Sequence, residues 1–381
     1  MPDFPLPTVI RGGNRNRSAP LVVLLHGRGA NENDMMPMAN SLPQSVSFAA
    51  LRAPIAEGQG FAWFANRGIG RPIPESLAAT MDWFTRWLDE EAAPERPVIL
   101  IGFSGGAAFA GGLVLREPQR FAGAAILYGT LPFDGGVPTI RGRLTGVNVF
   151  VAQGEQDHVI PRELLDRTWN YVLTDSGAPA LAMTVPGGHD MTSDVLGSLR
   201  EWVRERVQYL ERHGSGIAHD ADPKWAALGG TLRERAGPPP DVTHEIPQQQ
   251  TSQNAPRELQ DAIYQLGMQL KGVRTGPSAI SVPGARAFTV NPGADEWSAF
   301  IVRETGEFAH LHPPYDGSMH LALPPQLHAD VIKKGWGIPH PLAGLRLSSG
   351  MCMVFGPRDD DELVIVSEFL RASHAYATGG S

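Results

Sequence analysis

The sequence predicts an α/β fold with a mainly parallel sheet, followed by a small α+β domain with an antiparallel sheet. Two observations support this. From residue 20 to about 212, short apolar runs alternate with longer amphipathic runs, the order of strand–helix–strand units with right-handed crossovers. Beyond residue 257, short apolar runs are grouped together, with helical patterns at both ends. A chain of 381 residues is also too long for one ordinary hydrophobic core, so two domains are expected.

Apolar patterning predicts the elements of the first domain. Short continuous apolar runs are typical of strands buried on both faces, and apolar residues at helical spacing are typical of helices that cover a sheet. The predicted strands are residues 21–25, 98–101, 124–127, 147–152 and 181–187. The predicted helices are residues 76–92, 106–116, 164–175 and 193–214.

Residues 214–256 interrupt this pattern. The stretch "AGPPPDVTHEIPQQQTSQNAP" holds five prolines, three consecutive glutamines and few apolar residues, which predicts a linker. We expect Trp225 to attach the first part of this linker to one domain. The predicted organisation is therefore a first domain over 1–213, a linker over 214–256 and a second domain over 257–381.

In the second domain, strands and helices are predicted from the same patterns. The predicted helices are residues 257–270, 325–335 and 359–377, the last with three aspartates at its positive N-terminal end. The predicted strands are residues 288–290, 298–302, 307–310, 319–323 and 350–356. Strands grouped in this way indicate an antiparallel sheet.

Composition narrows the class of protein. The formal net charge of −8 provides no basic surface for nucleic acid or anionic lipid. Cys352 is the single cysteine, so no internal disulfide can form and a reducing compartment is expected. The start "MPDFPLPTVIRGG" has no basic segment or apolar core of a signal peptide, and no run of about 18 apolar residues exists. We expect a cytoplasmic protein without a membrane span or a nucleic-acid partner.

The stretch "VILIGFSGGAAFAGGL", residues 98–113, supplies a candidate nucleophile. A buried strand runs into Gly102-Phe103-Ser104-Gly105-Gly106, which matches G-x-S-x-G, and a helix follows. In that motif the serine lies in strained backbone on a sharp strand-to-helix turn, where only glycine leaves room for neighbouring chains. Ser104 is therefore the predicted nucleophile.

A serine hydroxyl needs a base to take its proton and a third group to orient that base. Asp157 follows a predicted strand in "VNVFVAQGEQDHVIP", and His189 follows the next one in "LAMTVPGGHDM". Ser104, Asp157 and His189 therefore occur in the order serine, acid, histidine, each after its own strand. Asp134 is the main rival acid, but it follows a strand too early in that order. The occurrence of all three in these contexts disfavours a turn serine, a helix cap and a solvent histidine.

Attack on an ester carbonyl creates an oxyanion that requires preorganised N–H donors. The backbone N–H of Gly105, directly after the nucleophile, is one predicted donor. The loop His26-Gly27-Arg28-Gly29 matches H-G-x-G, so the N–H of Arg28 is the second. We expect His26 to support its loop. Trp63 in "FAWF" is a candidate substrate-contacting residue, and a core or rim aromatic is at least as well supported.

Residues 20 to 212 resemble the phospholipase/carboxylesterase family of α/β-hydrolases, through "LLHGRGANENDM", "ILIGFSGGA", "GEQDHVIP" and "PGGHDM". The resemblance implies an α/β-hydrolase fold and hydrolysis of esters or thioesters. Two departures concern the substrate. The family usually has glutamine where this chain has Gly105, and the chain lacks the long apolar loops of a fatty-acyl tunnel. A short acyl group is therefore expected.

The second domain holds His310, His312 and His320 in "EFAHLHPPYDGSMHLALP". On a strand, residues i and i+2 face the same side, so His310 and His312 could converge on a metal ion. No cysteine is near, and we see no Glu or Asp at a matching position. Polar histidines at strand ends or in loops are therefore the favoured interpretation, and no metal is assigned.

Residues 257 to 378 resemble the small luciferase domain of uncharacterised bacterial proteins and fungal luciferases. The resemblance rests on "SVPGARAF", "HLHPPYDGSMHLALP", "GWGIPHPLAG" and "VFGPRDDDEL". It implies a compact ligand-binding or enzymatic unit. It does not imply light emission, because no luciferin or flavin site is identified.

The sequence thus predicts a cofactor-free serine hydrolase for small carboxylic esters or thioesters. The first alternative is a ligand-binding or regulatory protein whose hydrolase fold has lost useful turnover. The second is a bifunctional enzyme whose second domain processes the hydrolase product. The sequence leaves open the acyl chain, the leaving group, the oligomeric state and the role of the second domain.

Overall fold

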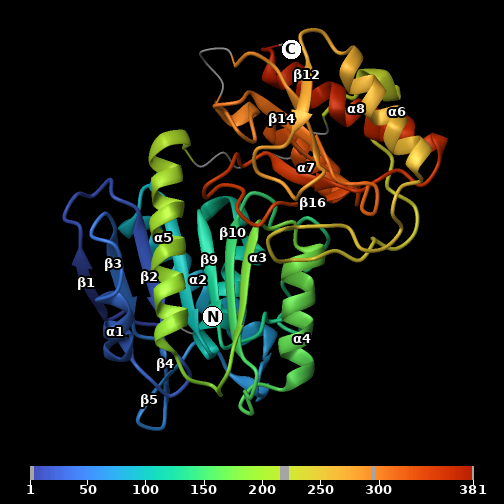
Figure 1. Ribbon diagram of the computed structural model, residues 1–381. Coiled ribbons are helices and arrows are strands. Elements are labelled where there is room, and N and C mark those ends of the chain that lie inside the picture. Colours follow the sequence, from blue (N-terminus) through green and yellow to red (C-terminus); the bar gives the residue numbers. More distant parts are fainter. Residues whose placement is uncertain (1–3, 215–222, 293–296, 380–381) are drawn as a thin grey trace. The chain divides into compact units, whose positions relative to one another are not determined.

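The computed structural model describes residues 4–214, 223–292 and 297–379. The chain divides into two compact units, Met1–Ser215 and Gly216–Ser381, called here the first unit and the second unit. In Figure 1 the first unit runs from blue to light green and the second from yellow to red. Among the described residues, no helix combines the length and apolar character that crossing a membrane requires.

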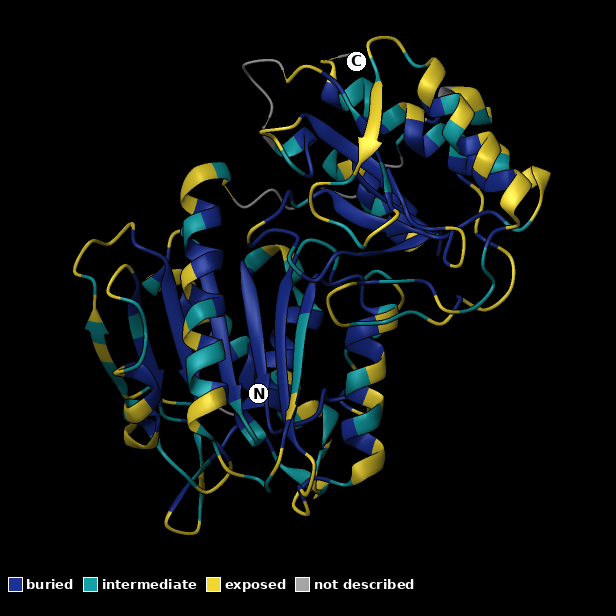
Figure 2. Cartoon of the chain, in the orientation of Figure 1, coloured by how far each residue is buried: buried dark blue, intermediate teal, exposed yellow. Residues whose placement is uncertain are grey.

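The first unit is built on one seven-stranded sheet. Its spatial order is β1 (Val9–Gly13), β3 (Ser47–Leu51), β2 (Leu21–Leu25), β8 (Val98–Phe103), β9 (Gly123–Leu127), β10 (Asn148–Gly154) and β11 (Ala180–Val185). Only the β1–β3 pair is antiparallel. Strands β2, β9 and β10 are buried along their whole length (Figure 2), as expected for parallel strands covered on both faces. The predicted mainly parallel sheet is confirmed, whereas β1 and β3 were not predicted.

Helices cover this sheet (Figure 1). They are α1 (Met36–Ala39), α2 (Pro74–Glu91), α3 (Gly105–Arg116), α4 (Arg162–Asn170) and α5 (Ser193–His213). Short helical turns lie at Glu32–Met35 and Pro118–Arg120, and a π-helical turn at Tyr171–Asp175 continues α4. Two small ribbons, β4 (Ile55–Glu57) with β5 (Gly60–Ala62) and β6 (Asn66–Gly68) with β7 (Arg71–Pro72), complete the first unit.

The second unit holds a six-stranded antiparallel sheet, which confirms the predicted α+β class. Its order is β12 (Arg274–Pro277), β13 (Arg286–Thr289), β14 (Glu307–Leu311), β15 (Met319–Ala322), β17 (Met351–Val354) and β16 (Gly337–Pro339). Its helices are α6 (Arg257–Gln269), α7 (Pro325–Lys333) and α8 (Asp360–Ala377), with a helical turn at Ala226–Leu228 and another at Trp297–Ala299. Phe288, Phe308 and Phe369 are fully buried in its core.

Two expectations for the second unit are wrong. Residues 298–302 form no strand, because a helical turn ends at Ala299 and the buried Phe300 and Ile301 follow it as a loop. Residues 223–256 are not an open linker. Trp225 is buried and donates its indole N–H to Asp330 (2.8 Å), and the buried Gln250 accepts the N–H of Gly356 (2.9 Å). Polar amides can be buried when they are hydrogen-bonded, which a count of apolar residues does not detect. Residues 215–222 lie outside the described residues.

Candidate active site

Ser104 lies on the sharp turn between β8 and α3. Its φ of 53° and ψ of −114° place a non-glycine residue in strained backbone. The flanking glycines make this turn possible, because no side chain would fit. A Cβ at Gly102 would lie 2.2 Å from the carbonyl oxygen of Gly106, and a Cβ at Gly106 would lie 2.1 Å from that of Leu25. The turn thus presents the Ser104 hydroxyl at the carboxyl end of β8.

Ser104, His189 and Asp157 are joined by hydrogen bonds. The Nε2 atom of His189 is 2.8 Å from Ser104 Oγ, and its Nδ1 is 2.8 Å from Asp157 Oδ2. Asp157 follows β10 and His189 follows β11, so the strand order brings both loops to the end of β8. Because an ionised carboxylate only accepts, Nδ1 of His189 carries the hydrogen and Nε2 directs a lone pair at Ser104. This arrangement can remove a proton from the serine.

The rival acid Asp134 lies elsewhere. Its Oδ2 is 3.3 Å from Arg71, and about half of its side chain is exposed. The side chain of Asp157 is fully buried instead, and its Oδ1 accepts the N–H groups of Val159 (2.9 Å) and Ile160 (3.1 Å). These two bonds fix the carboxylate that faces His189.

The loop after β2 brings the backbone nitrogen of Arg28 close to Gly105, the residue directly after Ser104. Gly105 is the first residue of α3, so its N–H has no partner inside the helix. A Cβ at position 105 would lie 3.2 Å from the backbone nitrogen of Arg28. A glycine at this position therefore leaves the loop after β2 room to approach the helix start.

His26 supports the loop after β2. Its Nε2 accepts the N–H of Ala53 (3.1 Å), and its Nδ1 faces the carbonyl oxygen of Gly27 (2.7 Å). Burial lowers the pKa of His26, which keeps the ring neutral and Nε2 able to accept. Trp63 donates its indole N–H to the carbonyl oxygen of His26 (2.8 Å). Both side chains therefore hold the loop that carries Arg28.

A cavity of about 900 Å³ opens at Ser104 and His189. Its apolar lining includes Met35, Met38, Phe64, Phe103, Ile160 and Leu196. Trp63 is not among the lining residues: it is 1% exposed and stacks on Phe109 at 4.7 Å between ring centroids. Of the two interpretations of Trp63, the structure therefore supports the core aromatic and not the substrate contact, while the neighbouring Phe64 lines the cavity.

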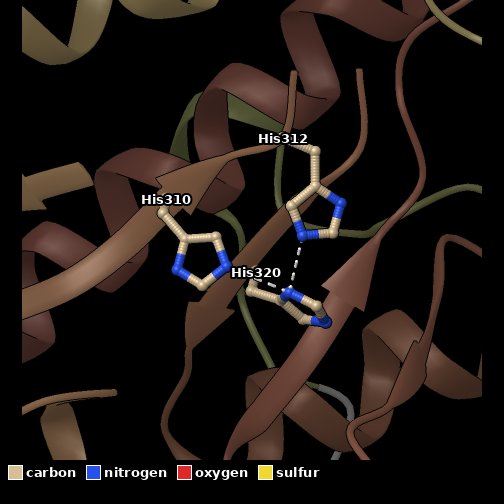
Figure 3. A group of neighbouring side chains, drawn as sticks. All are labelled: His310, His312 and His320. Carbon is tan, nitrogen blue, oxygen red and sulfur yellow. Dashed lines mark hydrogen bonds between the residues drawn. The ribbon is translucent and has the colours of Figure 1, made fainter. Parts of the chain in front are cut away.

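His310, His312 and His320 form a second group of interest, in the second unit (Figure 3), called here the histidine cluster. One ring nitrogen from each lies within 4.8 Å of the other two. All three residues are buried: His310 and His320 lie on β14 and β15, and His312 directly follows β14. Two carboxylates are hydrogen-bonded to this cluster: Glu307 to His310 and Asp316 to His312. No local sequence pattern connects these carboxylates with the histidines.

Comparisons with known proteins match each unit separately. The family model for a luciferase domain matches residues 305–373. A luciferase of Armillaria gallica is 38% identical over 81 residues, which cover 20% of this chain and 30% of that protein. The chain therefore spans under a third of the length of that luciferase.

For the first unit, "Putative hydrolase MhqD" of Bacillus subtilis (strain 168) is 26% identical over 192 residues, covering 49% of this chain and 94% of that protein. A crystal structure of the Bacillus cereus carboxylesterase, 23% identical, covers 52% of this chain and 94% of its own with a TM-score of 0.46. The phospholipase/carboxylesterase family model matches residues 7–206, more than half of the chain. The chain therefore belongs to the phospholipase/carboxylesterase family.

Proposed function

We propose that the first unit is a serine hydrolase that cleaves carboxylic esters or thioesters through an acyl-enzyme. The observation that supports this most strongly is the chain of hydrogen bonds from Asp157 through His189 to Ser104. Ser104 Oγ attacks the carbonyl carbon while His189 Nε2 takes its proton. Asp157 holds the histidine in the required tautomer and stabilises the imidazolium that forms.

The developing oxyanion is bound by the backbone N–H groups of Arg28 and Gly105. When the tetrahedral intermediate collapses, the bond to the leaving group breaks and His189 returns its proton to the departing oxygen or sulfur. Water then attacks the acyl-enzyme, again with His189 as base, and releases the acid. This sequence requires no cofactor.

The proposed substrate is a small ester with a short acyl group. A cavity of about 900 Å³ with a mostly apolar lining suits a small molecule held by apolar contact, with the reacting carbonyl at Ser104. Gly105 also adds no side chain to this cavity. An intact hydrogen-bonded triad disfavours the alternative of a binding protein with an inactive hydrolase fold. For domain organisation, we propose that the first unit carries the complete ester-hydrolysing site.

A panel of p-nitrophenyl esters and thioesters of graded chain length, given to the full chain, tests this proposal. We expect an initial burst of about one equivalent of p-nitrophenol, followed by a slower steady rate, because the acyl-enzyme accumulates. Turnover should fall beyond roughly eight acyl carbons, since the sequence lacks the long apolar loops of a fatty-acyl tunnel. Absence of turnover on every substrate would refute the hydrolase. Faster hydrolysis of the palmitate than of the butyrate would refute the short acyl group.

A further inference from the structure

Strand register brings the histidine cluster together in the second unit. His310 on β14 and His320 on β15 are direct partners in the antiparallel pair. His312 lies two residues beyond His310, so it projects from the same face of the sheet (Figure 3). The three residues are 1%, 1% and 4% exposed for His310, His312 and His320. The three rings are therefore shielded from bulk solvent.

The outer nitrogens of His310 and His312 face carboxylates. Nδ1 of His310 is 2.7 Å from Glu307 Oε1, and Nδ1 of His312 is 2.7 Å from Asp316 Oδ2. The hydroxyl of Ser278 and the N–H of Ala279 also donate to Glu307, so both of its oxygens act as acceptors. An ionised carboxylate only accepts, so both Nδ1 atoms carry hydrogens. The Nε2 atoms of both rings are then bare lone pairs.

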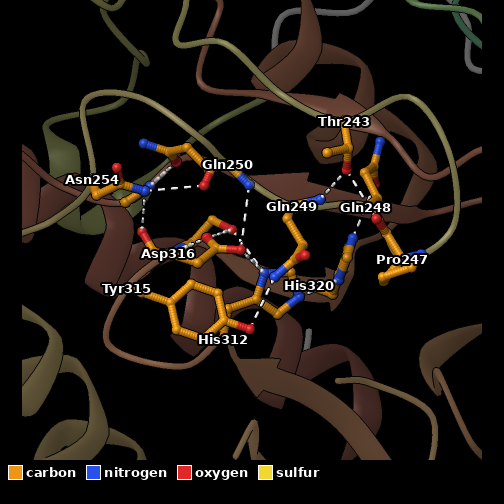
Figure 4. A network of polar contacts seen from close by, with 12 residues as sticks. Thr243, Pro247, Gln248, Gln249, Gln250, Asn254, His312, Tyr315, Asp316 and His320 are labelled. Atoms are coloured by element: carbon orange, nitrogen blue, oxygen red, sulfur yellow. Dashed lines mark hydrogen bonds and ion pairs between the residues drawn. The ribbon is translucent and has the colours of Figure 1, made fainter. Parts of the chain in front are cut away.

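Gln248 determines which nitrogen of the third ring, that of His320, carries the hydrogen (Figure 4). Its Nε2 donates to the carbonyl oxygen of Pro339 (3.2 Å), which orients the amide so that Oε1 faces His320 Nε2 at 2.9 Å. His320 must therefore carry its hydrogen on Nε2, and its Nδ1 is bare.

Three lone pairs consequently face one another. His320 Nδ1 is 3.2 Å from His310 Nε2 and 3.0 Å from His312 Nε2, and with all three rings neutral neither contact has a hydrogen. Such an arrangement is repulsive, and a cation bound between the rings would relieve the repulsion. Metal–nitrogen bonds of about 2.0–2.1 Å in tetrahedral geometry separate ligand nitrogens by about 3.3 Å. We propose that these three nitrogens bind one divalent transition-metal ion such as Zn²⁺.

Ligand chemistry and charge agree with this class of metal. Three imidazoles suit Zn²⁺ and its first-row neighbours, whereas Ca²⁺ and Mg²⁺ require oxygen ligands. Within the described part of the chain, Glu307 and Asp316 form no ion pair with lysine or arginine. A dication would balance these two buried carboxylates, and each carboxylate would orient a ligating ring, as outer partners of metal-bound histidines do. Three protein ligands leave a fourth position for water or another oxygen ligand.

Metal binding by the full chain tests this proposal. The protein is depleted with a strong chelator, dialysed and titrated with Co²⁺ or Zn²⁺, and the bound metal is counted by elemental analysis. We expect one equivalent per chain, with visible absorption bands of low-coordinate Co²⁺. Asp316→Asn should weaken affinity by about 10- to 100-fold, and His312→Gln should weaken it further. His328→Gln is the matched control, a buried histidine of the same unit outside the cluster, and should bind like wild type.

The proposal is overturned if the depleted wild-type chain takes up no metal. It is also overturned if Asp316→Asn and His312→Gln bind metal as tightly as wild type, since the ion would then lie elsewhere. Near-ultraviolet circular dichroism of each variant reports whether the second unit is folded. If His312→Gln fails to fold, the wild-type stoichiometry and the milder Asp316→Asn variant still decide the question.

Discussion

His189 Nδ1 lies 2.8 Å from Asp157 Oδ2, while the other oxygen of that carboxylate binds two backbone N–H groups of the loop after β10. An asparagine at position 157 can retain the backbone bonds through its oxygen and present its NH₂ group to His189. The histidine would then be held in the wrong tautomer for accepting a proton from Ser104. We expect Asp157→Asn to lower kcat by about 10⁴ with little change in thermal stability.

Asp134→Asn is the matched control, because Asp134 pairs with Arg71 on the surface. Its effect on ester hydrolysis should be negligible, since exposed ion pairs contribute little. Steady-state kinetics and thermal unfolding of both variants check this. If Asp134→Asn were the severe variant, the assignment of Asp157 as the orienting acid would be wrong.

Gly106→Ala should damage the site without touching a reacting group. The added Cβ would lie 2.1 Å from the carbonyl oxygen of Leu25 and 2.6 Å from that of His26, so α3 or β2 must move. A displacement of this kind at the nucleophile can cost about 10² in rate. We expect a loss of at least that size in kcat, together with a lower Tm.

Gly197→Ala, within α5, is the control for the previous substitution. A Cβ at position 197 would meet no described atom within 4 Å beyond its own stretch of helix, and alanine favours a helix interior over glycine by about 0.5–1 kcal/mol. This variant should be slightly more stable and fully active. Equal effects of the two substitutions would contradict the close packing inferred for the turn at Ser104.

His328 on α7 makes the stability of the second unit sensitive to acid. Burial lowers its pKa to about 4, whereas the unfolded value is about 6.5. Between these values the unfolded chain binds more protons than the folded one. Stability is therefore complete above about pH 6.5 and falls towards pH 4, by up to about 1.4 kcal/mol per pH unit from this residue. Denaturant unfolding across this window should show a flatter slope for His328→Gln.

Identical slopes for wild type and His328→Gln would show that His328 is not held neutral by burial.

Removal of metal with a chelator tests whether ester hydrolysis by the first unit depends on the metal proposed for the second unit. The triad requires no metal, and the proposed ion belongs to the second unit, so removal of metal should leave the rate of ester hydrolysis unchanged. Parallel assays of bound metal and p-nitrophenyl butyrate hydrolysis on the same chelated sample check this. Loss of hydrolysis on chelation and its recovery with Zn²⁺ would contradict a metal-free mechanism.

The sequence alone predicts the parallel sheet of the first unit, and the structure brings its three candidate catalytic residues together. Ser104, Asp157 and His189 each follow a strongly apolar strand, so topology determines which loops meet. Short or exposed strands were missed, such as β12, whose residues are all exposed. Such strands carry neither an apolar run nor an alternation that would reveal them.

The histidine cluster could be predicted only in part. Alternation along a strand places His310 and His312 on one face, but His320 joins them through the register of β14 and β15, which the intervening loop determines. Gln248 lies 72 residues before His320, in a stretch whose composition indicates a linker. Its role depends on a tertiary hydrogen bond that no local pattern reports.

Labelling of Ser104 tests the central claim, that the first unit is a serine hydrolase. The full chain is treated with a fluorophosphonate, which reacts with activated serines, and the modified peptide is identified by mass spectrometry. We expect modification at Ser104 with loss of ester hydrolysis, and neither labelling nor turnover in Ser104→Ala, whose kcat should fall by on the order of 10⁶. Ser18→Ala, at an exposed serine, should behave like wild type. Labelling at another serine, or retention of most activity in Ser104→Ala, would contradict the account.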